Sequence, residues 1–449
     1  MVGIPRLVVA APASGGGKTT VATGLMAAFS ARGLAVSPHK VGPDYIDPGY
    51  HSLATGRPGR NLDPYLTSEE LIGPLFLHGA AGADIAVVEG VMGLYDGAVG
   101  QGDFASTAHV AKLLRAPVVL VVDASSAARS IAAVVHGFMT FDSGSEGRVR
   151  LGGVILNRIG SDRHEEICRE AVEALGVPVL GVLRRHDGIA TPSRHLGLIP
   201  VAERHADAVE TVARLGGLIA ETCDLDALLE LAHGAPPLTV RPWSAGDAVE
   251  AGPGRPVVAV AGGPAFTFGY AEQVELLRAA GAEVVTFDPL REERLPEGAG
   301  GLVIGGGFPE VYASELAANR ALLAEVGRFS GAVYAECAGL LYLTKALDGV
   351  PLAGVVDASA EMTARLTLGY RSAVAVADSV VARAGERVRG HEFHRTAVTP
   401  GRGGVAAWQW STEGAEGFVQ GTLLASYLHL HWAGTPWFAR RFADACGRT

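Results

Sequence analysis

The sequence predicts an α/β protein of two doubly wound domains in tandem, and three observations support this prediction. Short β-branched runs alternate with amphipathic stretches in the first half, as the strands and crossover helices of a parallel sheet do. Between about Leu231 and Pro256 the alternation lapses into a stretch rich in Pro, Gly and Ala, and it then starts again. The length of 449 residues suffices for two or three domains. We therefore predict a first domain over 1–235, a linker over 236–256 and a second domain over 257–449.

The elements of the first half follow from local patterns. We expect strands at Leu7–Ala10, Ala35–Lys40, Ile85–Val88, Val118–Val122 and Gly153–Leu156. A helix is expected over Thr19–Arg32. Val21, Leu25 and Phe29 recur there at intervals of four and form one apolar face. Gly33 stands where a C-terminal cap is expected, so the helix should end just before it.

The second half repeats the α/β alternation with a different glycine loop. We expect strands at Val257–Val260, Glu283–Phe287 and Gly301–Ile304. A helix over Tyr270–Ala280 is expected to bury Val274 and Leu277 against the sheet. The two halves share no internal repeat, so duplication does not explain the architecture.

Charge and hydropathy exclude several classes of partner. The chain has 37 basic and 47 acidic residues and a formal net charge of −10, which argues against nucleic acid and anionic membranes as partners. No apolar run is long enough to cross a bilayer, and the N-terminus lacks the pattern of a signal peptide. We therefore expect a cytoplasmic protein.

Cysteine and histidine spacing argues against a structural metal site. The four cysteines lie far apart without a CxxC pair, so neither a disulfide scaffold nor a structural zinc site is expected. His391 and His394 invite a zinc interpretation, but a zinc-binding helix needs its second histidine four residues after the first, and Arg395 stands there.

A phosphate-binding loop joins the first strand to the first helix. Residues 11–20 read APASGGGKTT. The glycines let backbone N–H groups converge on anionic oxygens, Lys18 can reach the β- and γ-phosphates, and Thr19 offers a hydroxyl to Mg²⁺. The usual motif has Gly where this chain has Pro12, and a glycine-rich turn with an incidental lysine is the alternative. We predict ATP binding by Ser14, Gly15, Gly16, Gly17, Lys18, Thr19 and Thr20.

Polar residues at predicted strand ends are candidates to complete this site. Glu89 ends a buried strand, and Asp44 and Asp47 follow another, at the edge of a parallel sheet where ligands collect. Asp96 lies in the glycine-rich segment that follows Glu89 and is a candidate to approach the transferred phosphate. Asn157 could read an adenine edge. For the aspartates and Asn157 the alternative is a simple turn residue.

Cys337 is the candidate nucleophile of the second half. It stands between an apolar strand and an apolar helix, with small neighbours that permit a sharp elbow, and a helix N-terminus would lower its thiol pKa. A buried structural cysteine is the alternative. The loop Gly305–Gly307 follows a strand and can present N–H groups to an oxyanion. His429 and His431 could act as the base.

Five strings in the chain carry a family resemblance. They are KVGPDYIDP (40–48), NLD (61–63), EGVMGLYDG (89–97), PSRHLGL (192–198) and YAECAG (334–339). With a variant P-loop and a cysteine elbow, the chain resembles the cobyrinic acid (hydrogenobyrinic acid) a,c-diamide synthases of cobalamin biosynthesis over nearly its whole length. The first domain is similar to that of dethiobiotin synthetases, and the second to class I glutamine amidotransferases.

The resemblance implies a carbon–nitrogen ligase. ATP would convert the a and c acetate carboxylates of cobyrinate or hydrogenobyrinate into acyl phosphates, and ammonia released from glutamine would displace phosphate. Its small-molecule partners would be the corrin polycarboxylate, ATP and glutamine, its cofactor Mg²⁺, and a homodimer is a further expectation.

The resemblance also implies roles for individual residues. The Mg²⁺ ligands would be Thr19, Asp44 and Glu89. The catalytic residues would be Lys18, Asp47, Asp96, Cys337, His429 and His431, with His429 the first choice as base. The oxyanion donors would be Gly306, Gly307 and Ala338. The corrin-binding candidates are Arg194 and His195.

One departure concerns the catalytic histidine. Class I amidotransferases commonly have a Glu two residues after it, where this chain has His431. We therefore expect a Cys–His dyad in which no carboxylate orients the imidazole.

Other substrates and one other class of protein remain open alternatives. Nickel-sirohydrochlorin a,c-diamide synthases, cobyric acid synthases and the amidases of peptidoglycan lipid precursors share this domain pairing. A partition-type ATPase switch would share the loop but not the second domain. The patterns do not choose between cobalt-containing and cobalt-free corrin, nor do they give the order of amidation.

Overall fold

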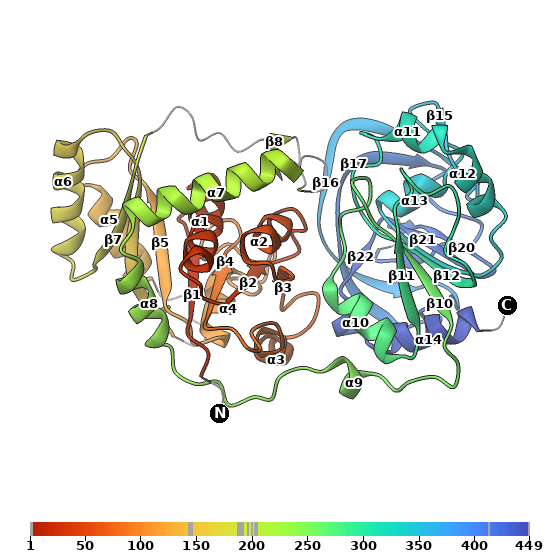
Figure 1. The fold of residues 1–449 in the computed structure, drawn as a ribbon, viewed down its shortest axis with the longest axis horizontal. Coiled ribbons are helices and arrows are strands. Elements are labelled where there is room, and N and C mark those ends of the chain that lie inside the picture. Colours follow the sequence, from red (N-terminus) through yellow and green to blue (C-terminus); the bar gives the residue numbers. More distant parts are fainter. Residues whose placement is uncertain are drawn as a thin grey trace. The chain divides into compact units, whose positions relative to one another are not determined.

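The computed structural model describes residues 3–141, 147–185, 193–194, 197–198, 201, 205–411 and 414–447. The chain divides into two compact units, Met1–Trp243 and Ser244–Thr449. Each unit contains a parallel or mostly parallel sheet with helices packed on it (Figure 1). The division lies inside the stretch that we expected to be a linker.

The first unit is built on a seven-stranded sheet with the order β3-β2-β4-β1-β5-β6-β7. All its neighbouring strands are parallel. The strands are β1 (Arg6–Ala10), β2 (Val36–Val41), β3 (Arg60–Leu62), β4 (Ile85–Glu89), β5 (Val118–Asp123), β6 (Leu151–Ile159) and β7 (Val179–Arg184). Their apolar runs are buried because helices cover both faces of the sheet.

The helices α1 to α6 of the first unit lie between these strands along the chain, and α7 and α8 follow β7. They are α1 (Lys18–Ala31), α2 (Asp47–Thr55), α3 (Glu69–Gly79), α4 (Thr107–Leu113), α5 (Ile131–Thr140), α6 (Asp162–Glu173), α7 (His205–Thr222) and α8 (Leu225–His233). The long helix α7 packs along α1 (Figure 1). The short strands β8 (Ser193–Arg194) and β9 (Gly197–Leu198) form a separate pair.

The second unit has a six-stranded sheet with the order β11-β10-β12-β13-β21-β20, in which only β20 is antiparallel to its neighbour. Its strands are β10 (Val257–Ala261), β11 (Glu283–Phe287), β12 (Ala299–Ile304), β13 (Ala332–Glu336), β20 (Phe418–Gln420) and β21 (Leu423–Ser426). Its helices are α9 (Ala245–Ala248), α10 (Ala271–Ala279), α11 (Ala313–Ala318), α12 (Arg320–Gly327), α13 (Ala338–Leu343) and α14 (Trp437–Cys446), with the 3₁₀ turn η1 (Trp432–Gly434).

A second sheet of this unit was not anticipated from the sequence. It is formed around a long antiparallel hairpin with a register shift between Met362 and Thr367. Its strands are β14 (Ala346–Leu347), β15 (Val350–Pro351), β16 (Ser359–Ala375), β17 (Arg387–Thr399), β18 (Trp408–Gln409), β19 (Ala415–Glu416) and β22 (His429–Leu430). β22 joins this sheet through the pairing of His391 with His429, which brings two distant histidines together.

The strands expected from the sequence lie where predicted, to within two or three residues at their ends. Helix α1 ends at Ala31, and Gly33 has a left-handed φ of 84°. One expectation about α10 was wrong, because Val274 is only half-buried while Glu272 is buried. The reason is that α10 packs against η1 and α14 as well as the sheet, so a second face is covered.

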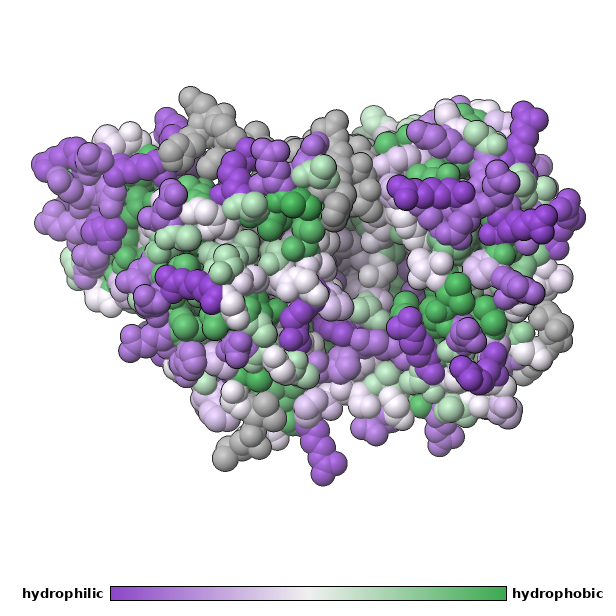
Figure 2. Space-filling model, viewed as in Figure 1, coloured by the Kyte–Doolittle hydropathy of each residue, from purple (hydrophilic) through white to green (hydrophobic). Residues whose placement is uncertain are grey.

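Helix α6 is amphipathic, with one face packed inward and the other exposed to solvent. Helix α6 buries Cys168 and Val172 and turns its ion-paired residues outward, where they form the hydrophilic edge at the left of Figure 2. Among the described residues, no helix combines the length and hydropathy needed to span a membrane.

Candidate functional site

The phosphate loop has the geometry that its glycines suggest. Gly15 and Gly17 have φ angles of 76° and 100°, which favour glycine. A Cβ added at Gly17 would lie 2.3 Å from Asn157 Nδ2, so a side chain cannot fit there. Ser14 and Gly15 are exposed at the tip of the loop, and Thr20 is half-buried in the first turn of α1. The loop therefore leads directly into the N-terminus of α1, as an anion site requires.

Lys18 lies inside this loop. Its Nζ donates to the carbonyl of Ala13 at 3.1 Å and to that of Met92. Burial, and then the charge of Lys40, lower the pKa of Lys18 to about 8. The lysine thus spans the loop and the segment after β4, which is the position from which it could reach a phosphate.

Beside the loop lies a buried group of charged residues, which we call the acid–lysine cluster: Thr19, Lys40, Asp47, His51 and Glu89. Lys40 Nζ donates to Asp47 Oδ2 at 2.6 Å and to Glu89 Oε1 at 2.9 Å. Thr19 Oγ1 donates to Glu89 Oε1 at 2.6 Å. His51 Nε2 lies 2.6 Å from Glu89 Oε2. Buried charges of this kind must be paired, and here one ammonium group bridges two carboxylates.

The two carboxylates of the cluster differ in their pKa. Burial raises the pKa of Asp47 well above its usual range, and the charges of Asp44 and Glu89 add to this rise. Burial also raises the pKa of Glu89, but Lys40 and His51 more than offset it and hold that pKa below its usual range. Glu89 is therefore the firmly ionised member.

The expected magnesium ligands are only partly brought together. Asp44 Oδ1 accepts the N–H groups of Ile46 at 2.7 Å and Asp47 at 3.3 Å, so this carboxylate shapes the turn into α2. Asp47 Oδ2 instead lies 3.4 Å from Thr19 Oγ1. Asp44 stays a predicted ligand, and Asp47 becomes a further candidate because it lies beside Thr19.

The donor set suits Mg²⁺ in its chemistry. Thr19, Asp47 and Glu89 supply hard oxygen atoms beside the phosphate loop, as Mg²⁺ prefers. Lys40 occupies the space between the two carboxylates, so metal binding requires its ammonium group to move. The described residues contain no group of three or more His, Cys, Asp or Glu side chains arranged to hold a metal.

Asn157 and Asp96 both shape loops. Asn157 Nδ2 donates to Gly16 O at 3.0 Å, and its Oδ1 accepts the N–H of Arg158 at 2.8 Å. This amide fastens the phosphate loop, a geometry that does not favour the adenine-reading role. Asp96 Oδ2 accepts the N–H of Gly93 at 2.9 Å, and its charge acts on Lys18. Asp96 therefore lies close enough to Lys18 for its charge to act on that residue, and its approach to the transferred phosphate stays a prediction.

Cys337 forms a strained elbow between β13 and α13. Its φ of 47° and ψ of −100° are unusual for a residue with a side chain, and such strain is typical of nucleophiles at strand–helix junctions. Its N–H donates to Ser426 O at 2.8 Å, and the N–H of Gly339 donates to Gly305 O at 3.0 Å. The elbow is thus held between the end of β21 and the glycine loop.

The pKa of the Cys337 thiol differs from the lowered value that we expected. Burial raises the pKa of Cys337 well above its usual range, and Glu310 adds to the rise, while the Ala338 N–H counteracts it. The expected lowering by the helix N-terminus is therefore wrong for this state, because α13 is short and the sulfur is almost enclosed. A buried protonated thiol needs a base.

His429, the predicted base, lies against the glycine loop that also contacts the elbow. A Cβ added at Gly306 would lie 2.6 Å from His429 Cε1, so the imidazole touches the glycine loop. His429 Nδ1 lies 3.6 Å from Glu336 Oε2, and the ring stacks on that of His391 at 4.9 Å between centroids. A carboxylate therefore approaches the imidazole, although none was expected to orient it. Glu336 comes from the strand of the nucleophile rather than from the position after the histidine.

His431 is engaged elsewhere. Its Nδ1 accepts the N–H of Ala433 at 3.3 Å and caps η1. Its Nε2 lies 3.7 Å from Glu272 Oε2, and its ring packs on Tyr270 at 4.2 Å between centroids. These contacts favour His429 over His431 as the base.

One oxyanion assignment needs correction. The N–H of Gly306 donates to Phe268 O at 3.1 Å, and Phe268 returns a hydrogen bond to Gly306 O. Gly306 therefore serves the packing of the loop, while Gly307 and Ala338 stay as predicted donors. Among the corrin-binding candidates, His195 and the side chain of Arg194 lie outside the described residues.

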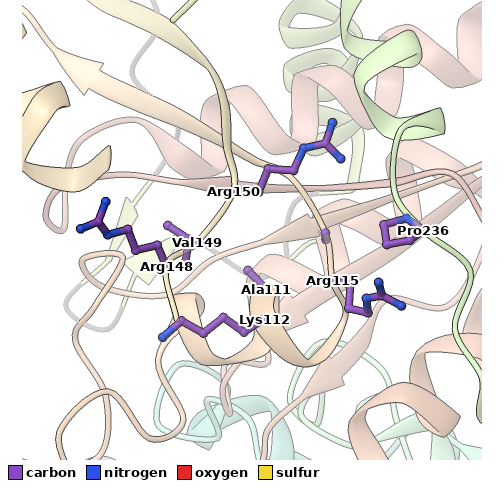
Figure 3. Close-up of a pocket in the computed structure, with 8 residues that line it drawn as sticks. Ala111, Lys112, Arg115, Arg148, Val149, Arg150 and Pro236 are labelled. Carbon is purple, nitrogen blue, oxygen red and sulfur yellow. The ribbon is translucent and has the colours of Figure 1, made fainter. Parts of the chain in front are cut away.

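A basic cavity of about 310 Å³ lies where strands β5 and β6 begin, at the end of the first sheet away from the phosphate loop. Lys112 pairs with Asp103 at 3.1 Å, and Arg150 donates to Gly234 O at 2.7 Å. Figure 3 shows the guanidinium groups of Arg148 and Arg150 pointing away from each other. The cavity therefore does not form an anion cradle.

Sequence reasoning missed four residues of these sites: Lys40, His51, Glu336 and His391. Lys40 ends an expected strand at the ligand-binding edge, so the same rule that selected Glu89 would have found it. Glu336 adjoins the nucleophile, but no local pattern shows that it faces a histidine on another strand. Contacts between distant strands need the fold.

Comparison with known proteins agrees with this geometry. Residues 7–199 match the CobQ/CobB/MinD/ParA nucleotide binding domain, and residues 257–437 match the CobB/CobQ-like glutamine amidotransferase domain. The chain is 63% identical to hydrogenobyrinate a,c-diamide synthase of Streptomyces coelicolor, over 99% of this chain and 98% of the relative. It is 57% identical to the hydrogenobyrinate a,c-diamide synthase of Thermobifida fusca, over 98% of this chain and 97% of the relative.

A further relative carries a different name. The chain is 46% identical to cobyrinate a,c-diamide synthase of Gloeobacter violaceus, over 98% of this chain and 96% of the relative. The predicted tandem of a P-loop domain and a glutamine amidotransferase-like domain is thereby confirmed. With identities of 46–63% over nearly the full length of both chains, the chain belongs to the hydrogenobyrinate and cobyrinate a,c-diamide synthase family.

Proposed function

We propose that this chain amidates the a and c acetate carboxylates of hydrogenobyrinate in cobalamin biosynthesis, with ATP and glutamine as cosubstrates. The observation that carries the proposal is the similarity over the full chain to relatives of that name, at 51–63% identity. Relatives named for cobyrinate are 40–46% identical. This difference favours the cobalt-free corrin as substrate. A partition-type ATPase switch does not account for the amidotransferase domain.

The first unit would activate the corrin carboxylate. A carboxylate oxygen attacks the γ-phosphorus of ATP, ADP leaves, and the acyl phosphate then reacts with ammonia and releases phosphate. Lys18, reaching from the loop, would stabilise the negative charge of the transferred group. Mg²⁺, held by Thr19, Asp47 and Glu89, would supply further positive charge to the phosphates. Lys40 would then be released from the two carboxylates.

The second unit would supply ammonia. His429 takes the thiol proton of Cys337 while sulfur attacks the carboxamide carbon of glutamine. The oxyanion is stabilised by the N–H groups of Gly307 and Ala338. The proton passes to the departing amine, ammonia leaves, and water hydrolyses the thioester to glutamate. Because the resting thiol is protonated, transfer of its proton to His429 is part of the first step.

The test is a direct assay with purified full-length protein. Hydrogenobyrinate, ATP, Mg²⁺ and glutamine should give the a,c-diamide, with one ATP hydrolysed per amide, as followed by mass spectrometry. Cobyrinate and nickel sirohydrochlorin in parallel reactions test the competing substrates. Higher kcat/KM with either of these would refute the assignment of hydrogenobyrinate, and the absence of any amidated corrin would refute the function.

A further inference from the structure

We propose that Glu336 is the positioning residue of the glutaminase site, which orients the imidazole of His429 and stabilises its protonated form. This inference rests on the proposed glutaminase function. Glu336 would take the place of the carboxylate that amidotransferases of this class commonly have two residues after the histidine. It reaches the ring from the residue directly before the nucleophile.

The carboxylate of Glu336 is held in a fixed orientation. Its Oε1 accepts hydrogen bonds from the hydroxyl of Tyr334 and from the N–H of Leu430, the latter at 3.1 Å. Tyr334 lies two residues earlier on the same face of β13, and Leu430 directly follows His429. The same carboxylate therefore holds the strand that carries the histidine. Its second oxygen, Oε2, is left facing His429 Nδ1 at 3.6 Å.

The residues of this arrangement are buried, so their polar groups depend on one another for hydrogen-bond partners. Glu336 is 5% exposed, and Tyr334 and His429 are each 1% exposed. A buried carboxylate without donors is strongly destabilising, so each of its acceptor positions is expected to face a donor. The distance of 3.6 Å exceeds a hydrogen bond, but such catalytic contacts are commonly long in the free enzyme and tighten with substrate.

The other sides of the imidazole are also defined. His391 stacks on the ring at an interplanar angle of 15°, and Gly306 lies against Cε1. Burial holds the pKa of His391 well below its usual range, so the stacked ring is neutral and adds no positive charge. Glu336 is the carboxylate that lies beside the His429 ring.

The chemical consequence concerns the tautomer. A carboxylate beside Nδ1 favours a proton on that nitrogen and leaves Nε2 as the acceptor for the thiol proton. When Cys337 transfers its proton to Nε2, the new positive charge forms next to Glu336. Because the resting thiol is protonated, this stabilisation acts on the step in which the nucleophile forms.

The test compares three full-length variants. Glu336→Gln removes the charge while keeping the shape, and Glu336→Asp keeps the charge. Glu416→Gln is the matched control, because Glu416 is also buried and bonded to the β21–β22 segment, through Ser426 Oγ and the N–H of Tyr427. The measurements are kcat/KM for glutamine hydrolysis against pH, and the rate of corrin amidation with ammonia.

For Glu336→Gln we expect a loss of about 100-fold in kcat/KM for glutamine and an unchanged ammonia-dependent rate. The acidic limb of the pH profile should move to lower pH, because the base loses its neighbouring anion. Glu336→Asp should recover part of the rate and the position of the limb. Glu416→Gln should keep the wild-type limb.

Three results would overturn the proposal. They are a glutamine-dependent rate within threefold of wild type in Glu336→Gln, a reduced rate with an unmoved acidic limb, and a parallel loss of the ammonia-dependent activity, which would show a purely structural role. Failure of the proposed function is distinguishable, because the wild type itself would then release no ammonia from glutamine.

Discussion

Gly306 and His429 are in such close contact that a single methyl group cannot be placed between them. An added Cβ at 306 would come within 2.6 Å of His429 Cε1. The absence of a side chain at this position therefore leaves room for the imidazole against the glycine loop.

The first prediction follows from this contact. Gly306→Ala should displace the imidazole and lower kcat/KM for glutamine hydrolysis by roughly 100-fold, because small misplacements of a catalytic group are costly. Amidation with ammonia should be unchanged. Gly404→Ala is the control, since an added Cβ there meets nothing within 4 Å. Equal glutaminase rates in the two variants would contradict the argument.

Cys337→Ala is expected to abolish glutamine-dependent amidation and to leave ammonia-dependent amidation intact. The reason is that the thioester cannot form, while the first unit keeps its own chemistry. The rates of both reactions on hydrogenobyrinate are the measurement. Cys223→Ala, which changes a cysteine of the first unit, should behave as wild type. Full glutaminase activity in Cys337→Ala would rule out this nucleophile.

Lys18→Ala should abolish ATP-dependent amidation and weaken ATP binding, because the loop loses the positive charge aimed at the phosphates. Glutamine hydrolysis measured without ATP should continue, which shows that the variant is folded. The measurements are the affinity for ATP, by calorimetry, and the rate of ADP formation. Unchanged ATP turnover would refute the phosphate-loop assignment.

Lys40→Met tests the acid–lysine cluster. Removing the ammonium group leaves Asp47 and Glu89 buried without their bridge, and this type of change costs roughly 3–5 kcal/mol. Thermal unfolding without metal should therefore occur at a lower temperature. Added Mg²⁺ should raise the melting temperature more in the variant than in wild type, because the metal no longer competes with the lysine. The same Mg²⁺ response in both proteins would argue against a shared site.

The stability of the folded protein is expected to depend on pH through Glu416. Burial raises the pKa of this glutamate from 4.5 to about 7. Between pH 4.5 and pH 7 the folded state therefore keeps a proton that the unfolded state has released. The stabilisation that this proton gives the folded state is complete below pH 4.5 and is lost as the pH rises through 7. This loss is about 3 kcal/mol. Glu416→Gln cannot titrate, so its stability relative to wild type should rise by this amount from pH 4.5 to 8.

Urea unfolding of both proteins at a series of pH values is the measurement for this prediction. The free-energy difference between variant and wild type should change in the stated direction. A difference that is constant across the range would mean that Glu416 titrates at its ordinary value.

The phosphate loop and the cysteine elbow could be predicted from the sequence because each depends on neighbouring residues. Gly15, Gly17 and Lys18 lie between a strand and a helix that are recognisable by their periodicity, and the small residues around Cys337 permit its strained turn. The edge at which Glu89 would lie followed from the polarity of parallel strands. These features need only local geometry and the general rules of the fold.

The sequence by itself determined the two α/β domains, the anion-binding loop and the strand–helix junction of the nucleophile, because glycines, small residues and apolar periodicity act over a few residues. The tertiary structure decided that Asp47 rather than Asp44 lies beside Thr19, that Lys40 bridges two carboxylates, and that Glu336 faces His429. The physical reason is that these contacts join different strands and helices. Their distances depend on how sheets and helices pack, which no short pattern contains.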